Sequence, residues 1–365
     1  MKKIVLITSE FPPLPGGIGT HAYHLAMGFT QKGYDVSVLT DRRSTDDAIE
    51  DMFDTSLPFT VHRVSRKSFG RTYFTRIRKA FQLVKKDPTS TVIASGKFSL
   101  WLGALLRIRY SKLKTLAVIH GTELKAGGWL SRLITKKSLS SFSKIIAVSQ
   151  FTKSKVLEVH PQASVTVITN GVVLPESPPK VSQKKEGVRL ISVGNVTRRK
   201  GQHNVIAALP LLREAYPGIH YDVVGLPTET ERLQHLATSL DVASLVTFHG
   251  ALPEQKMQEL LLQSHIFMLL SEHLPNGDFE GFGIVVLEAN ALGIPAIGTR
   301  DSGIADAIVH GQTGLLVNPH QPEEIKAAIA IILANYELYS SRALEWAKAN
   351  QWPDVIEQYL QELTP

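Results

Sequence analysis

The residues best suited to chemistry lie between Phe279 and Asn290, in the segment FEGFGIVVLEAN. Here a loop with two glycines follows an apolar run and precedes a predicted helix that begins at about Gly283. The first backbone N–H groups of a helix have no partner within it, so they attract an anion such as a diphosphate. Gly281 and Gly283 allow the backbone to approach such a ligand closely.

Two glutamates accompany this turn. Glu280 lies in the loop, and Glu288 lies between one and two turns inside the predicted helix, so the two need not share a helical face. They could accept hydrogen bonds from hydroxyl groups at the two ends of one extended ligand, a sugar and a ribose. The alternative interpretation is a helix-capping carboxylate together with an ordinary surface glutamate.

A second loop, Gly194–Gly201, also follows a predicted strand and precedes a predicted helix. Arg198, Arg199 and Lys200 are three consecutive cations that could neutralise phosphates. The alternative interpretation is a solvated loop.

A third glycine loop includes Gly16 and Gly17. Residues 17–22 fit the pattern G-x-G-x-x-A, and Asp41 closes the next predicted strand, which makes a weak dinucleotide fingerprint. The five residues Phe11–Pro15 separate these glycines from the first strand, whereas a dinucleotide turn is tight. NAD or FAD binding is therefore an alternative that the spacing disfavours.

His120 ends a predicted strand in the segment VIHGTE, where a doubly wound sheet presents functional groups. It could be a neutral hydrogen-bonding group or a proton carrier, or it could be structural. His21 and His24 share a helical face, but the sequence offers no third convergent ligand and no Asp-x-Asp pair. We therefore expect no metal site.

Strand and helix patterns alternate along the chain, which predicts parallel sheets of the α/β class. Two series of strands are separated by Pro175–Gly187, a segment rich in proline, serine and charge that is typical of a linker. The expected architecture is two doubly wound Rossmann-like domains that face one another across a cleft. The expected strands are 3–9, 36–40, 59–64, 91–95, 115–120, 144–148 and 165–169, then 188–194, 220–224, 245–249, 266–270, 295–298 and 315–317.

Composition narrows the possible functions. The 365 residues include no cysteine, which excludes disulfides, thiolate metal sites and a cysteine nucleophile. No apolar stretch is long enough to span a membrane or to form a signal-peptide core. The net charge of +7 is uneven, because residues 1–175 hold 26 Lys and Arg against 11 Asp and Glu. That imbalance favours an anionic partner, although a solvated basic surface is the alternative, and no nucleic-acid-binding signature is present.

With these motifs in order, the chain resembles the retaining nucleotide-sugar glycosyltransferases of the GT-B fold, of the glycosyltransferase family 4 or group 1 type. The resemblance spans nearly the whole chain, and closest to it are bacterial enzymes that act on lipids or lipid-linked glycans, including phosphatidylinositol mannosyltransferases. Six motifs in the same order carry it: Gly16-Gly17, His120-Gly-Thr-Glu, Val148-Ser149, Asn170-Gly171-Val172, Arg199-Lys200-Gly201 and Glu280-x7-Glu288.

The resemblance implies a role for each matching residue. Glu280 would bind the donor sugar and Glu288 the nucleotide ribose, while His120 would contact the sugar near the reacting carbon. Lys200 would bind the diphosphate. The remaining implied contacts to that group are the N–H groups of Phe282, Gly283 and Ile284 and the loop of Gly16 and Gly17.

The resemblance also implies catalysis without a metal or other cofactor, with retention by front-face attack. Two departures from the family pattern stand out. Asn195 occupies a position where many relatives carry a phosphate-binding arginine, so Arg198 or Arg199 would have to replace it. Gly225–Thr228 replaces a common Gly-x-Gly-Pro turn near the base, which leaves UDP, GDP and ADP open.

In relatives the C-terminal helix returns to the first domain. We therefore expect an acceptor-binding domain of residues 1–174 plus 350–365, a linker of 175–187 and a donor-binding domain of 188–349. The implied acceptor is a lipid-linked molecule or a glycan, in synthesis of cell-envelope polysaccharide or glycolipid.

The expected location is the cytoplasm, with reversible contact to anionic membrane through helices within 71–86 and 98–114. Besides the dinucleotide enzyme, a non-catalytic sugar-nucleotide-binding scaffold is the other alternative function.

Overall fold

The computed structural model describes residues 2–65, 69–124, 128–175 and 187–363, and the chain divides into two compact units. Unit 1 comprises residues 1–170 and 352–365, and unit 2 comprises residues 171–351. Most of the expected linker, residues 176–186, lies outside the described residues. The C-terminal segment belongs to unit 1, and so that unit is built from both ends of the chain.

Unit 1 contains a seven-stranded parallel sheet in the order β3-β2-β1-β4-β5-β6-β7. The strand order reverses between β1 and β4, which is the topological switch point of a doubly wound sheet. The central strands are continuous apolar runs because helices cover both faces. The strands are β1 (Lys3–Thr8), β2 (Asp35–Asp41), β3 (Thr60–Val64), β4 (Thr91–Ser95), β5 (Lys114–Ile119), β6 (Lys144–Ala147) and β7 (Val165–Val167).

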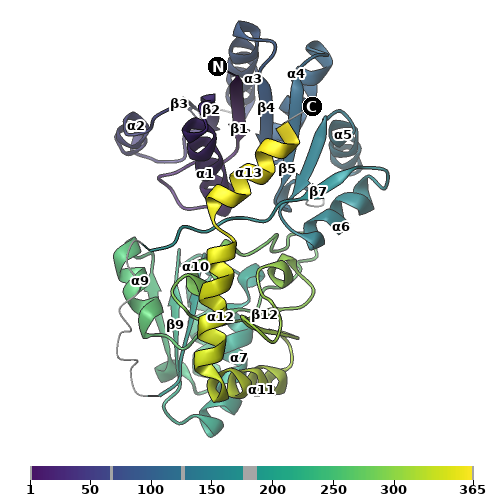
Figure 1. Cartoon of the computed structure of the whole chain (residues 1–365). Helices are drawn as coiled ribbons and strands as arrows, with labels where there is room; N and C mark the ends of the chain where they lie inside the picture. Colours follow the sequence, from purple (N-terminus) through teal and green to yellow (C-terminus); the bar gives the residue numbers. More distant parts are fainter. Residues whose placement is uncertain (1, 66–68, 125–127, 176–186, 364–365) are drawn as a thin grey trace. The chain divides into compact units, whose positions relative to one another are not determined.

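Helices pack on both faces of this sheet. Val5, Val92 and Ala117 project from one face onto α3, α4 and α5, while α1 packs beside the C-terminal helix α13 (Figure 1). The helices are α1 (Gly17–Gln31), α2 (Asp47–Thr55), α3 (Phe69–Lys86), α4 (Lys97–Arg109), α5 (Trp129–Leu139), α6 (Gln150–Val159) and α13 (Trp352–Leu363), with the short 3-10 helix η1 (Thr122–Leu124) after β5.

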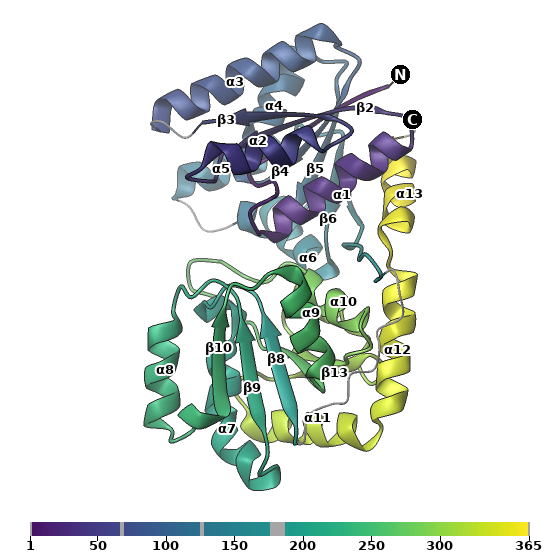
Figure 2. The same ribbon diagram turned by 90° about the vertical axis from the view of Figure 1, so that its left-hand side faces the viewer.

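Unit 2 has a six-stranded parallel sheet in the order β10-β9-β8-β11-β12-β13. Figure 2 shows β10, β9 and β8 side by side. Its strands are β8 (Arg189–Val193), β9 (His220–Val224), β10 (Val246–Gly250), β11 (Ile266–Leu269), β12 (Ala296–Thr299) and β13 (Gly314–Val317). Its helices are α7 (Gln202–Ala215), α8 (Thr230–Ser239), α9 (Glu254–Gln263), α10 (Ile284–Asn290), α11 (Pro322–Ala334) and α12 (Tyr336–Ala349), with 3-10 turns η2 (Arg198–Lys200), η3 (Ala243–Leu245) and η4 (Gly303–Asp306).

The core of unit 2 lies between the sheet and helices α7, α8 and α11. Leu190, Tyr221 and Met268 from the strands pack with Val205 and Ile329 from the helices, and all five are buried. Burying one such side chain contributes about 1.5–3 kcal/mol. The two parallel α/β sheets confirm the predicted fold class, and each strand lies within two residues of its predicted bounds.

Helix bounds decide where several candidate residues lie. The first helix begins at Gly17, so Gly17 belongs to the first turn of α1 and only Gly16 precedes it. The last helix begins at Trp352, because proline is well accommodated in a first turn. The helix after Gly283 ends at Asn290.

Candidate donor site and the His120 loop

In unit 2, the acidic loop before Gly283 and the cationic loop Gly194–Gly201 lie against each other. Glu280 pairs with both Arg199 and Lys200, and its Oε2 lies 2.9 Å from Nζ of Lys200. The side chains of Lys200 and Glu280 are each 12% exposed. Burial alone would raise the pKa of Glu280, but the cations of Lys200 and Arg199 outweigh it and lower that pKa to about 2. Glu280 is therefore an ionised acceptor at neutral pH.

Close backbone packing holds this pair of loops in place. A Cβ atom at Gly201 would lie 1.7 Å from the carbonyl oxygen of Leu270, and one at Gly303 would lie 1.9 Å from that of Gly281. The N–H of Gly303 donates to the carbonyl oxygen of Glu280 over 3.0 Å. Larger residues at either glycine would push the cationic loop or the acidic loop out of position.

Glu288 has the opposite electrostatic character. It lies on α10, which begins after Gly283 in a left-handed backbone conformation (φ 84°). Burial, aided by the carboxylate of Glu254, raises the pKa of Glu288 to about 7 in spite of Lys200. Phe282 and Gly283 are buried, and Ile284 opens the helix, so the predicted anion-binding turn and both glutamates belong to one structural unit.

The structure distinguishes the two candidate arginines. Arg199 contacts Glu280 and has its Nε 3.7 Å from Asp278, whereas Arg198 is exposed and lies 3.6 Å from Glu272. Asn195 is exposed, and its carbonyl oxygen accepts a hydrogen bond from Gln202. Only Arg199 of the two therefore shares the Glu280 cluster.

The sequence analysis did not identify Glu272, which follows β11. Its carboxylate accepts hydrogen bonds from Asn204 (3.0 Å) and pairs with His203 (2.8 Å). Its N–H donates to the carbonyl oxygen of Arg199. Glu272 thus fastens the cationic loop to the start of α7, a role that its isolated position in the sequence does not signal.

In unit 1, His120 follows β5 and is half-buried. Its Nε2 lies 3.0 Å from the hydroxyl of Ser95, and burial lowers its pKa to about 3. The backbone N–H groups of His120, Gly121 and Gly96 all donate to the buried carboxylate of Glu123 over 2.9–3.1 Å. His120 is therefore a neutral imidazole on a backbone that Glu123 holds rigid, and the sequence analysis had not singled out Glu123.

His21 lies beneath this loop. Its ring centroid is 4.8 Å from that of His120, and its Nε2 is 3.1 Å from the hydroxyl of Tyr359 on α13. His24 instead stacks on Trp352. The two histidines therefore pack against the C-terminal helix, and among the described residues no group of three or more His, Asp or Glu side chains is placed to hold a metal ion.

Gly16, Gly17 and Asp41, the residues of the dinucleotide alternative, do not form a dinucleotide-binding arrangement. Gly16 lies against the carboxylate of Glu10, and Gly17 is helical. Asp41, which would have to bind a ribose, forms an ion pair with the buried Arg76. The acidic residue of that fingerprint thus has a structural partner within unit 1.

Comparison with known families matches each half of the chain. Residues 15–176 match the model of Glycosyltransferase Family 4, and residues 175–347 match that of Glycosyl transferases group 1. The chain belongs to the GT-B glycosyltransferases. The expected glycosyltransferase class is thereby confirmed, and the dinucleotide enzyme is not supported.

Relatives and solved structures extend the match to nearly full length. The glycogen synthase of Mycobacterium tuberculosis is 26% identical, covering 91% of this chain and 86% of the relative. The GDP-mannose-dependent alpha-(1-6)-phosphatidylinositol monomannoside mannosyltransferase of the same organism is also 26% identical, covering 96% and 95%.

Among solved structures, sucrose-phosphate synthase from Thermosynechococcus elongatus has a TM-score of 0.80 at 20% identity, covering 100% and 98% of the two chains. Anabaena HepE in complex with UDP-glucose has a TM-score of 0.79 at 18% identity, covering 100% and 99%. At these identities the structural likeness establishes the GT-B fold of this glycosyltransferase.

Proposed function

We propose that this glycosyltransferase moves a hexosyl group from a UDP- or GDP-sugar to a lipid-linked or glycan acceptor, with retention of the anomeric configuration and without a metal. The observation that carries the proposal is the pairing of ionised Glu280 with Arg199 and Lys200 beside the Gly283 turn. This arrangement offers acceptors for hydroxyl groups and donors for phosphates within one cluster.

Each group of the cluster has a part in binding the donor. Lys200 and Arg199 would face the diphosphate, and the N–H groups of the turn would complete its coordination. Glu280 would then accept hydrogen bonds from the sugar hydroxyls. Glu288 would accept hydrogen bonds from the ribose, which would favour its ionised form.

The transfer step follows from these roles. The bond between the anomeric carbon and the diphosphate oxygen breaks, and a bond to the acceptor oxygen forms on the same face. The acceptor proton passes to the departing phosphate. Negative charge develops on that leaving group, where preorganised donors contribute a few kcal/mol each. The neutral imidazole of His120 would hydrogen-bond the sugar near the reacting carbon rather than carry charge.

The names of the relatives guide the choice of substrates. One relative is named for GDP-mannose and a phosphatidylinositol mannoside, and HepE was solved in complex with UDP-glucose. In unit 1, 26 Lys and Arg residues stand against 14 Asp and Glu residues, which suits an anionic lipid-linked acceptor. GDP-mannose is therefore the first donor to test, and the inner face of a plasma membrane is the proposed location.

The test is a thermal-shift screen with UDP, GDP, ADP and their sugars. Binding stabilises the folded state by RT ln(1 + [L]/Kd), so the preferred nucleotide would raise Tm most. At a nucleotide concentration near the parent's Kd, Lys200→Ala should strongly reduce that shift, whereas Glu345→Ala on an exposed face of α12 should leave it unchanged. A shift in Lys200→Ala as large as in the parent would overturn the proposed donor site.

Turnover separates an enzyme from a scaffold. Donor consumption with candidate acceptors, measured by release of the nucleoside diphosphate, should disappear in Glu280→Ala. Binding of the nucleotide without any release under all acceptor conditions would indicate a non-catalytic sugar-nucleotide-binding protein. Chelation of divalent cations should leave turnover unchanged, and its loss would refute the metal-independent mechanism.

A further inference from the structure

Helices α3, α4 and α5 form one outer layer over a single face of the unit 1 sheet, here called the α3–α5 layer. Val5, Val92, Ala117 and Ile145 mark the covered face of the sheet. The three helices contain twelve lysines and arginines and no aspartate or glutamate. Arg76 is buried and paired with Asp41, and the other eleven cations are exposed or partly exposed. A helical layer with one sign of charge creates a positive potential toward solvent.

The layer also exposes apolar side chains. Of the thirteen large apolar side chains that are exposed in the described part of the chain, seven lie on these three helices and four lie on α5. Trp129 is 78% exposed, Leu130 54% and Leu133 53%. Exposed apolar groups that gather in this way mark an interaction surface, whereas isolated ones do not.

The amphipathicity of α5 is reversed relative to an ordinary surface helix. Its sheet-facing side buries Thr135, Ser138 and Leu139, and Thr135 accepts a hydrogen bond from Trp101 of α4. At 100° per residue, the exposed Trp129 and Leu133 project from the opposite side. Four of the five large apolar residues of α5 therefore point away from the core of unit 1, and only Leu139 is buried.

Cations border this apolar face of α5. Arg132 and Lys136 flank it, Lys137 projects between its apolar residues, and all three are exposed. A tryptophan and leucines beside long cationic side chains are the composition of helices that lie in the interface of an anionic bilayer. The long stems of lysine and arginine allow their charges to reach the headgroups while the apolar residues insert.

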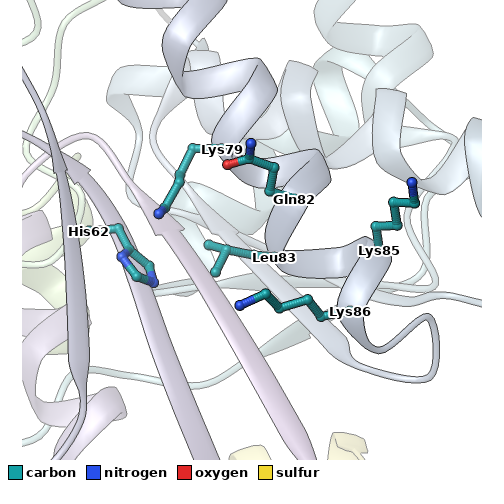
Figure 3. Close-up of a pocket in the computed structure, with 6 residues that line it drawn as sticks. All are labelled: His62, Lys79, Gln82, Leu83, Lys85 and Lys86. Atoms are coloured by element: carbon teal, nitrogen blue, oxygen red, sulfur yellow. The ribbon is translucent and has the colours of Figure 1, made fainter.

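The end of α3 adds a basic hollow of about 490 Å³ to the same layer. Figure 3 shows Lys79 and Lys86 directed toward the side of His62, with Leu83 between them and Lys85 pointing away. Burial lowers the pKa of His62, and Lys79, Lys3 and Lys86 lower it further. The lysines thus create a positive field at His62, which would attract an anionic headgroup.

We propose that α5 inserts into the interface of an anionic lipid bilayer, with the cations of the α3–α5 layer held against the headgroups. The sequence analysis expected contact through segments within α3 and α4, and the structure adds the inserting helix. Membrane contact itself does not depend on turnover, but its purpose rests on the proposed lipid-linked acceptor. Because α5 starts nine residues after His120 and contacts η1, insertion would bring the His120 loop close to the membrane surface.

Vesicle sedimentation without any nucleotide tests this proposal. Phosphatidylcholine vesicles containing phosphatidylglycerol should retain the protein, and pure phosphatidylcholine should retain much less. The double variant Leu130→Ser with Leu133→Ser should weaken binding by about tenfold or more, because both side chains lose apolar contact. The matched control is Ile331→Ser with Leu338→Ser in unit 2, two side chains that are each 47% exposed, and it should bind as the parent does.

Charge and depth give independent measurements. Reversal of Arg132 and Lys136 to glutamate should weaken binding by more than about fivefold per cation, since each contributes about that factor near an anionic surface. Fluorescence from Trp129, the most exposed of the four tryptophans, should shift to shorter wavelength on binding and should be lost in Trp129→Phe.

Circular dichroism and Tm of each variant establish that it is folded. Equal binding to both vesicle types, binding unaffected by the α5 variants, or an unshifted Trp129 signal would overturn the proposal. Capture of an acidic protein without vesicle binding would do the same. Failure of the donor proposal would instead appear as absent nucleotide binding with intact vesicle binding.

Discussion

The two units use the same strand, loop and helix device but treat charge in opposite ways. In unit 2, Glu280, Arg199 and Lys200 keep full charges in a nearly buried cluster. In unit 1, the His120 loop is held by a buried carboxylate and presents a neutral imidazole, while twelve of that unit's cations lie on helices α3, α4 and α5. The clustered charges of unit 2 thus suit a phosphate-containing ligand, and the spread cations of unit 1 suit an extended anionic surface.

A second contrast lies within unit 2. Glu280 and Glu288 are eight residues apart, yet the pKa of one falls to about 2 and that of the other rises to about 7. Burial raises the pKa of both residues, but Lys200 and Arg199 outweigh it at Glu280, whereas at Glu288 the carboxylate of Glu254 adds to it and only Lys200 opposes it. The same residue type is thus fixed in its ionised form at one position and remains titratable at the other.

The largest expected effect comes from removing the paired carboxylate. Glu280→Ala should lower kcat/KM by about 100- to 1000-fold, the range typical for loss of one preorganised polar contact at a reacting centre. Nucleotide binding should be retained, because the two cations remain. Measurement of nucleoside diphosphate release checks this, and the conservative variant Glu280→Gln should recover part of the activity. An unchanged kcat/KM would show that the charged cluster of unit 2 does not bind the donor sugar.

Removal of the phosphate-facing cation should have the next largest effect. Lys200→Ala should weaken UDP or GDP binding by about 10- to 100-fold, since hydrogen bonds between charged groups are worth about 1.5–3 kcal/mol. Isothermal titration calorimetry measures the change. The neighbouring exposed Arg198→Ala is the control and should cost much less. Equal losses in the two variants would indicate a diffuse electrostatic effect instead of a defined site.

The raised pKa of Glu288 predicts two pH dependences of opposite sign. Ribose hydroxyls donate to a carboxylate, so nucleotide affinity should rise as the pH increases through about 7. Stability should fall as the pH rises from about 4.3 to about 7 and should level off above, because in that interval the folded state keeps a proton that the unfolded state has lost. Glu288→Gln should flatten both profiles, and its Tm relative to the parent should increase from pH 5 to pH 8.

Affinity that is independent of pH in the parent would contradict this assignment of Glu288. The matched comparison is Glu280→Gln. The pKa of Glu280 lies near 2, so this variant should leave the pH dependence above pH 5 as it is in the parent.

The smallest expected effect lies in unit 1. Tyr359→Phe removes the hydroxyl that bonds the buried His21 and should destabilise the protein by about 0.5–1.5 kcal/mol. Chemical denaturation measures this. Because His21 supports the ring of His120, kcat should fall while the KM for the donor stays the same. Destabilisation without any change in kcat would make the contact purely structural.

The sequence predicted the fold well because buried parallel strands appear as short apolar runs between helical patterns. The position of the Gly283 turn was also predictable, because a loop with two glycines follows an apolar run and precedes a helical pattern. Glu280 and Glu288 belong to that loop and that helix. The sequence could not choose between Arg198 and Arg199, because adjacent residues project in different directions that only the backbone defines. Gly201 and its contact with Leu270 set that direction.

The roles of Glu123, Glu272 and helix α5 were not predicted. Glu123 accepts hydrogen bonds from backbone N–H groups, which any residue type could supply. Glu272 pairs with side chains that are about seventy residues away in the sequence. The helix α5 has an amphipathic pattern, but the pattern does not say which face meets the sheet. In the structure its polar Thr135 and Ser138 face inward, so a rule that buries the most apolar face would have oriented it wrongly.

The central claim is that unit 2 binds the nucleotide sugar between the Gly283 turn and its two glutamates. A crystal structure with the nucleotide sugar chosen by the thermal-shift screen tests it most directly. The account predicts diphosphate oxygens on Lys200 and the N–H groups of the turn, sugar hydroxyls on Glu280 and ribose hydroxyls on Glu288. A donor bound only to unit 1, or one that leaves both glutamates without contact, would contradict it.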